Sequence, residues 1–294
     1  MSRPHTFTPP PCARAHRLRT TRGEFAVLDV VPPGVTHGTA LLLPGYMGSK
    51  EDFVTLLEPL GAAGYRIVAV DGRGQYETGG TDREEIYAQY ELARDVLAQA
   101  SALRAGEEGG DGDGGAVHLV GHSLGGQIAR AAVLLDASPF RSLTLMSSGP
   151  AQVTEAQQVK VKLLADALAT MTMADVWEAL RAFDPPDEMV PNGEALRRRW
   201  LCHRPAQLIA TGRQLATEPD RVAELAATAL PVHVLSGERD DTWPVPLLDE
   251  MARRLGAHRT RIEGAEHSPN TDRPERTASA LASFWDGLRT AAHP

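Results

Sequence analysis

The chain has 294 residues, of which 42% are hydrophobic, and it carries a formal net charge of −8 at pH 7. The acidic charge argues against nucleic acid as a partner, and the lack of any run of about 18 apolar residues argues against a membrane-spanning segment. Cys12 and Cys202 are the two cysteines and neither belongs to a CxxC pair, so neither a disulfide framework nor a zinc site is expected.

The first 22 residues are rich in proline and basic side chains and contain no apolar segment of the kind found in secretory signals. We therefore interpret residues 1–22 as an arm that leads into the first strand. The same observation, together with the low cysteine content, predicts that the protein acts in the cytoplasm.

Strand and helix patterns alternate through the first half of the chain. One strand pattern alternates in polarity and the others are short apolar runs, typical of strands buried on both faces. The strands are expected at 24–30, 39–44, 65–71, 116–120 and 142–148. Apolar residues at helical spacing predict helices at 49–60, 83–105 and 124–135. A glycine-rich loop is expected at 106–115. This order predicts an α/β fold with a mostly parallel sheet and helices on both faces.

The alternation stops at about residue 150, and helical segments without a convincing strand follow to about residue 215. We interpret residues 150–215 as an inserted helical cap, so that residues 23–149 and 216–294 form the sheet domain. Beyond the cap the alternation resumes. The expected elements are a strand at 231–237, a helix at 245–255, a strand at 258–264 and a closing helix at 274–290.

The turn between the strand at 116–120 and the helix at 124–135 reads Gly121-His122-Ser123-Leu124-Gly125 and fits the pattern G-x-S-x-G. A sharp turn of this kind holds the serine in a strained backbone conformation, so its close neighbours must lack side chains. The free N–H groups of the helix N-terminus can receive a developing oxyanion. We predict that Ser123 is a nucleophile; an ordinary glycine-rich turn is the alternative.

A serine hydroxyl needs a base to remove its proton, and a carboxylate orients that base. His267 is the candidate base, because it lies in a loop between a predicted strand and the last helix; a surface-loop histidine is the alternative. His122 is set aside because we expect its ring to point the wrong way for a base. The acid is expected just after the strand at 231–237, where Asp240 has the better spacing and Asp241 is the nearest rival.

Four motifs, LLLPGYMGS, GHSLGG, GERDDTWP and GAEHSPNTDRPE, together resemble the α/β-hydrolase family, and the resemblance covers about residues 24 to 290. The resemblance implies three catalytic side chains: a nucleophile at Ser123, an acid at Asp240 and a base at His267.

The resemblance also implies a second oxyanion donor in the loop after the strand at 39–44. The family usually carries His-Gly there, whereas this chain has Pro44-Gly45-Tyr46. Because the donor is a backbone N–H, the change to proline leaves it intact. We assign one oxyanion donor to Tyr46 and the other to Leu124.

Substrate-binding residues are harder to predict. Trp177, on an apolar cap helix, and Trp243, after the acid turn, are candidates, with simple packing as the alternative. The arginines of the segment 197–200 are expected on a solvated helix face rather than bound to a substrate carboxylate. The loop 70–80 matches the family pattern only at Asp71, Arg73 and Gly74, and we interpret it as mainly structural.

The predicted nucleophile, base and acid favour acyl transfer on a small to medium, largely apolar carboxylic ester, lactone or thioester. This mechanism needs no metal and no organic cofactor, and a small-molecule substrate is the expected partner. Two alternatives remain: a C–C bond hydrolase or perhydrolase with the same triad, and a non-catalytic ligand-binding member of the fold. The sequence leaves the oligomeric state open.

Overall fold

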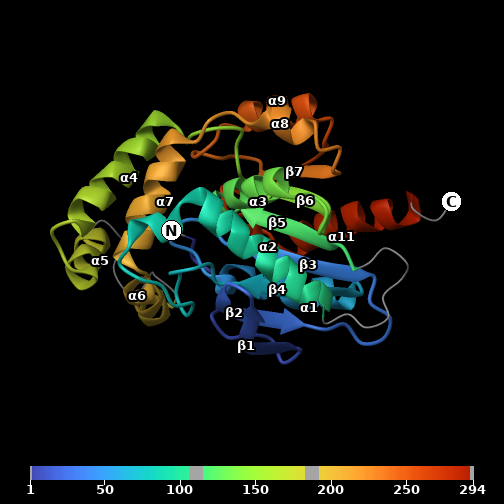
Figure 1. Ribbon diagram of the computed structural model, residues 1–294, viewed down its shortest axis with the longest axis horizontal. Helices are drawn as coiled ribbons and strands as arrows, with labels where there is room; N and C mark the ends of the chain where they lie inside the picture. The colour runs from blue at the N-terminus through green and yellow to red at the C-terminus, as the bar shows by residue number, and fades with distance from the viewer. Residues whose placement is uncertain (1, 106–114, 183–191, 292–294) are drawn as a thin grey trace.

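A central sheet crosses the protein, whose computed structural model describes residues 2–105, 115–182 and 192–291 (Figure 1). Within these residues the strands are β1 (Ala13–Thr20), β2 (Gly23–Val30), β3 (Gly38–Leu43), β4 (Tyr65–Val70), β5 (Val117–His122), β6 (Phe140–Met146), β7 (Val232–Gly237) and β8 (His258–Ile262). Their order across the sheet is β1-β2-β4-β3-β5-β6-β7-β8. The pairs β1-β2 and β2-β4 are antiparallel and the others are parallel, which confirms the expected mostly parallel sheet.

Helices cover both faces of this sheet. One face carries α2 (Gln89–Ala105), α3 (Leu124–Leu135), α8 (Val222–Ala226) and α9 (Val245–Leu255), and the other carries α1 (Val54–Ala62) and α11 (Pro274–Ala291). Short helical turns are η1 (Lys50–Phe53), η2 (Glu84–Tyr87) and α10 (Pro269–Asp272). Successive side chains of β3 alternate between the two layers, because Leu41 joins the first core cluster and Leu42 the second. The glycine-rich loop predicted at 106–115 lies outside the described residues except for Gly115.

The first strand differs from the sequence prediction, which treated residues 1–22 as an arm. β1 forms a hairpin with β2, with a register that runs from Ala13 opposite Val30 to Thr20 opposite Gly23. Leu18 is the buried side chain of this edge strand, and the rest are exposed or half-buried. A strand with so little apolar surface lacks the alternation that identifies a strand in sequence.

Four further helices form a separate layer on the left of Figure 1: α4 (Glu155–Leu168), α5 (Met173–Arg181), α6 (Gly193–Cys202) and α7 (Pro205–Thr217). They occupy the segment that we predicted to be the cap, and no strand occurs among residues 150–182 and 192–215. These helices have an apolar core of their own. Its buried members are Leu164, Leu168, Val176, Trp177, Leu196, Trp200 and Leu208.

The two chain segments that connect these cap helices to the sheet domain meet at Arg130 of α3, whose side chain is almost fully buried. Its guanidinium donates hydrogen bonds to the carbonyls of Gly149 (3.1 Å) and Pro150 (2.8 Å), in the segment that precedes α4. It also forms an ion pair of 2.6 Å with the buried carboxylate of Glu218, after the cap. Arg130 therefore ties the beginning of the cap to its end.

We expect Arg130→Met to lower the free energy of unfolding by about 3–5 kcal/mol, because the carboxylate of Glu218 stays buried without its cation. Urea denaturation followed by circular dichroism measures the change. Arg254→Met is the matched control, since it removes an exposed pair with Asp220 and should cost less than about 1 kcal/mol. Equal, small losses in the two variants would contradict the anchoring role of Arg130.

Candidate active site

The turn between β5 and α3 holds Ser123 in a conformation that is rare for a residue with a side chain, with φ +54° and ψ −120°. Glycines make the turn possible: a Cβ on Gly121 would collide with the carbonyl of Gly125, and a Cβ on Gly125 would collide with the carbonyl of Leu43. The backbone of α3 therefore begins directly against the end of β3. Ser123 itself is 6% exposed.

The structure brings the three predicted catalytic side chains together from distant parts of the sequence. The Oγ atom of Ser123 lies 3.0 Å from Nε2 of His267. On the other side of the imidazole, Nδ1 of His267 lies 3.0 Å from each carboxylate oxygen of Asp240. Serine, histidine and aspartate thus form a continuous hydrogen-bonded chain, with the geometry of a nucleophile, a base and an orienting acid.

The two candidate acids occupy different surroundings. The carboxylate of Asp240 is fully buried and also accepts hydrogen bonds from the backbone N–H groups of Thr242 (2.8 Å) and Trp243 (3.1 Å). The carboxylate of Asp241 instead accepts a hydrogen bond from the side chain of Gln157 on α4, at 2.9 Å. The structure therefore places Asp240, and not Asp241, against His267.

His122 takes part in the site in a way that the sequence did not indicate. Its Nε2–H group donates a hydrogen bond of 2.9 Å to the backbone carbonyl of His267, and the two ring centroids lie 5.2 Å apart. Burial, with a smaller contribution from the neighbouring His267, lowers the pKa of His122 to about 4. The His122 ring is therefore neutral at neutral pH and supports the base without adding a charge beside it.

The residues predicted to supply the oxyanion donors, Tyr46 and Leu124, both belong to segments that lie close to Ser123. Leu124 is the first residue of α3, so its N–H has no partner within the helix. Gly45, which precedes Tyr46, lies so close that a Cβ on it would be 3.1 Å from Cβ of Ser123. Neither the Tyr46 N–H nor the Leu124 N–H donates to a backbone carbonyl within the described residues. Both groups remain available to a substrate oxygen.

The side chain of Tyr46 connects this loop to the cap. Its phenol donates a hydrogen bond of 2.9 Å to the carbonyl of Leu208 on α7, and burial raises the pKa of the phenol. A Cβ on Gly212 of the same helix would lie 3.0 Å from the phenol oxygen. Helix α7 therefore packs closely against Tyr46, and a Cβ at position 212 would require Tyr46 or Val161 to shift, because it would also lie 2.7 Å from Cγ1 of Val161.

The two tryptophans that were candidates for substrate binding lie in packed surroundings. Trp177 is 5% exposed and belongs to the apolar core of the cap. Trp243 is fully buried, and its indole N–H is shared between the carbonyls of Ala151 (2.9 Å) and Gln152 (3.1 Å). Its ring centroid lies 6.2 Å from that of His267. The indole of Trp243 therefore binds the backbone of the first cap residues and lies next to His267.

The arginines of the segment 197–200 do not share one environment. Arg197 and Arg198 are exposed, as expected for a solvated helix face. Arg199 is fully buried, and its guanidinium lies 2.7 Å from the buried carboxylate of Asp52. It also donates to the carbonyl of Ser2. The expectation of a solvated face was wrong for Arg199, because a residue far away in the sequence supplies its counter-ion.

Buried histidines give the protein a predicted sensitivity to acid. Burial lowers four pKa values from 6.5, to about 3 for His118 and His233 and to about 4 for His122 and His203. Below pH 6.5 the unfolded chain binds protons at these rings while the folded protein does not. Stability should therefore fall as the pH drops from about 6.5 towards 4, by up to about 1.4 kcal/mol per pH unit for each ring.

Urea denaturation at a series of pH values between neutral pH and pH 4 measures this slope. His233→Phe should flatten the profile, because it removes one titrating ring and keeps an aromatic side chain beside Phe284. A stability that does not change over this window would show that the buried rings do not control it.

No helix in the described ranges is long and apolar enough to cross a bilayer. Likewise, the part of the chain that the structure describes contains no group of three or more His, Cys, Asp or Glu side chains that could hold a metal ion.

Comparison with known proteins places the chain in a family. A sequence model described as the alpha/beta hydrolase family matches residues 40–280. A pimeloyl-[acyl-carrier protein] methyl ester esterase of Methylococcus capsulatus is 31% identical over 184 residues, which cover 57% of this chain and 69% of that protein. The protein of the same name from Aeromonas hydrophila is 29% identical over 181 residues, with the same coverage of both chains.

Among solved structures, a thermophilic esterase from Thermogutta terrifontis shares the fold with a TM-score of 0.72 and 21% identity, over 94% of this chain and 100% of that one. The chain described here belongs to the α/β-hydrolase family.

Proposed function

We propose that this protein hydrolyses a small to medium, largely apolar carboxylic ester, lactone or thioester through an acyl-enzyme intermediate. The observation that carries the proposal is the unbroken hydrogen-bonded chain from Ser123 through His267 to Asp240. Two relatives that are named as ester-hydrolysing enzymes, with about 30% identity to this chain, support the same reaction class.

In the first half of the proposed reaction, Nε2 of His267 removes the proton from Oγ of Ser123 as the oxygen attacks the substrate carbonyl carbon. The N–H groups of Tyr46 and Leu124 donate to the oxyanion of the tetrahedral intermediate. When the intermediate collapses, the bond to the alcohol or thiol breaks, and the leaving group takes the proton from His267. The acyl group remains on Ser123.

In the second half, His267 removes a proton from a water molecule, which attacks the acyl carbonyl carbon. The second tetrahedral intermediate uses the same two N–H donors. Its collapse breaks the bond to Oγ, returns the proton from His267 to Ser123 and releases the carboxylic acid. Throughout, Asp240 holds the proton on Nδ1 of His267, so that Nε2 faces the serine.

An acyl methyl ester is a narrower candidate substrate, because the two curated relatives are both named for methyl ester hydrolysis. A single panel can test the reaction class and this narrower candidate together. Purified protein would be assayed on p-nitrophenyl esters of short, medium and long acyl chains, on a thioester and a lactone, and on methyl esters of the same acids.

We expect saturable hydrolysis in this panel. Where deacylation is slower than acylation, the p-nitrophenyl esters should also give a burst of p-nitrophenol equal to the concentration of active sites. Tight binding of an ester without turnover would contradict the proposal and favour a ligand-binding member of the fold. Much faster cleavage of a dienoic diketone, or perhydrolysis that far exceeds ester hydrolysis, would instead favour one of the other reactions.

A further inference from the structure

The peptide unit between Gly45 and Tyr46 is held from its carbonyl side. The oxygen of Gly45 accepts hydrogen bonds from Nε2 of Gln75 (3.0 Å) and from the backbone N–H of Gly48 (3.1 Å). In a trans peptide the carbonyl of one residue and the N–H of the next point in opposite directions within one rigid plane. The contacts that fix the carbonyl of Gly45 therefore also fix the direction of the Tyr46 N–H.

Gln75 is well placed to exert this control, because its own amide is held at both ends. Its Oε1 atom accepts the backbone N–H of Gly72 at 2.9 Å, and its Nε2 group donates to Gly45. These partners, one a donor and one an acceptor, define which end of the amide carries the nitrogen. The residue is 5% exposed, so water offers little competition for either bond.

A second connection joins the same two segments a few residues further along. Lys50, which follows the Gly45–Tyr46 turn, is buried and lies 3.0 Å from the carboxylate of Asp71 and 2.8 Å from that of Glu77. The backbone N–H of Lys50 also donates to Asp71, at 2.7 Å. The loop that carries Gln75 is therefore held at two points against residues 44–50, which we call the oxyanion segment.

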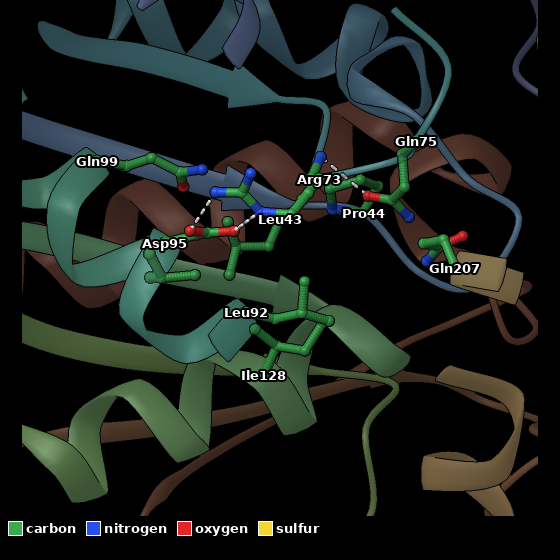
Figure 2. Close-up of a pocket in the computed structure, with 11 residues that line it drawn as sticks. Leu43, Pro44, Arg73, Gln75, Leu92, Asp95, Gln99, Ile128 and Gln207 are labelled. Atoms are coloured by element: carbon green, nitrogen blue, oxygen red, sulfur yellow. Dashed lines mark hydrogen bonds and ion pairs between the residues drawn. The ribbon is translucent and has the colours of Figure 1, made fainter. Parts of the chain in front are cut away.

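Gln75 also lines a cavity of about 30 Å³ behind the oxyanion segment, together with Pro44, Gln207 and residues of α2 and α3 (Figure 2). Gln99 lines the same cavity on the other side of this view. Its Oε1 has no hydrogen-bond partner among the described residues, whereas the side-chain hydrogen bond to the carbonyl of Gly45 comes from Gln75. The two glutamines are similar in burial and differ in their connection to the oxyanion segment.

We propose that Gln75 is a positioning residue for the oxyanion hole: by holding the carbonyl of Gly45 it aims the N–H of Tyr46 at the substrate oxygen. This role rests on the proposed ester hydrolysis. Because the oxyanion carries full charge only near the transition state, a misdirected donor affects kcat more than KM.

The test compares Gln75→Met with Gln99→Met, since the same change removes one buried amide from each side of one cavity and preserves side-chain length. For Gln75→Met we expect kcat on an ester to fall by about tenfold with KM within about twofold of wild type. This is less than the roughly 100- to 1000-fold loss typical of deleting a donor. The serine oxygen adds to the carbonyl carbon of a trifluoromethyl ketone and gives a hemiketal oxyanion. The inhibition constant of such a ketone should therefore rise by about the same factor as kcat falls. The inhibition constant of the product acid should not change.

Gln99→Met should keep the kcat and the ketone inhibition of the wild type, even if it changes the melting temperature. If Gln75→Met fails to fold, Gln75→Asn provides a second test, because the uncharged amide is one methylene shorter and cannot reach both the N–H of Gly72 and the carbonyl of Gly45.

Three results would overturn the role of Gln75 while leaving the proposed function intact. They are an unchanged kcat in the Gln75 variants, an equal loss in Gln99→Met, and a loss of ketone affinity matched by an equal loss of product affinity. A folded wild-type protein that neither hydrolyses esters nor reacts with a serine-directed fluorophosphonate would overturn the proposed function, and the role of Gln75 with it.

Discussion

Replacing Ser123 with alanine should remove ester hydrolysis almost completely, with kcat lower by a factor on the order of 10⁶. The expected loss is this large because the serine oxygen forms the covalent intermediate, and its loss also leaves His267, 3.0 Å away, without a proton to transfer. Intact-protein mass spectrometry after incubation with a fluorophosphonate gives an independent measurement. One adduct is expected on the wild type and none on Ser123→Ala.

Ser148→Ala is the matched control, because Ser148 is also a buried serine close to α3, but its Oγ has no hydrogen-bond partner among the described residues, His267 included. This variant should keep both the adduct and the activity. An adduct that persists on Ser123→Ala would place the reactive nucleophile elsewhere. A folded wild type without any adduct would argue against an activated serine and favour a protein that binds its ligand without turnover.

Asp240→Asn should lower kcat by about 10⁴-fold with little change in KM. An amide in this position can donate a hydrogen bond to Nδ1 of His267, which favours the tautomer that carries its proton on Nε2. That tautomer cannot accept the proton of Ser123. The side chain keeps its size, and its oxygen can still accept the N–H groups of Thr242 and Trp243, so the fold should persist.

The adjacent residue provides the comparison. Asp241→Asn alters a carboxylate that is bonded to Gln157 on the cap and not to His267, so kcat should stay within about twofold of the wild type. Steady-state kinetics of the two variants on one ester, with circular dichroism to confirm folding, decide the matter. A larger loss in Asp241→Asn than in Asp240→Asn would reverse the assignment of the acid.

Much of the fold follows from patterns within short stretches of sequence. The strand before Ser123 and the helix after it each span one periodic segment, and the glycines between them fix the sharp turn. The alternating strands and helices predicted the mostly parallel sheet in the same way. β1 was missed because Leu18 is its one buried side chain, and the pairing with β2 supplies what periodicity does not show.

The candidate site depends more on contacts between distant segments. Spacing alone left Asp240 and Asp241 as alternatives, and the turn that aims Asp240 at His267 is visible only in three dimensions. Arg199 is a second example. Its helix was expected to present it to solvent, but in the structure its guanidinium is buried against the carboxylate of Asp52. The catalytic roles assigned to Ser123, His267 and Asp240 remain predictions until the variants are measured.

The sequence by itself therefore determined the strand–turn–helix around Ser123, the alternation of strands and helices from β2 onward and the helical character of the segment between β6 and β7, because these depend on local periodicity and turn chemistry. Tertiary structure alone decided that Asp240 faces His267, that His122 donates a hydrogen bond to the backbone carbonyl of His267 and that Gln75 donates one to the carbonyl of Gly45. Each of these depends on a hydrogen bond between segments that only folding brings together, and the direction of such a bond is not encoded in the spacing of either segment.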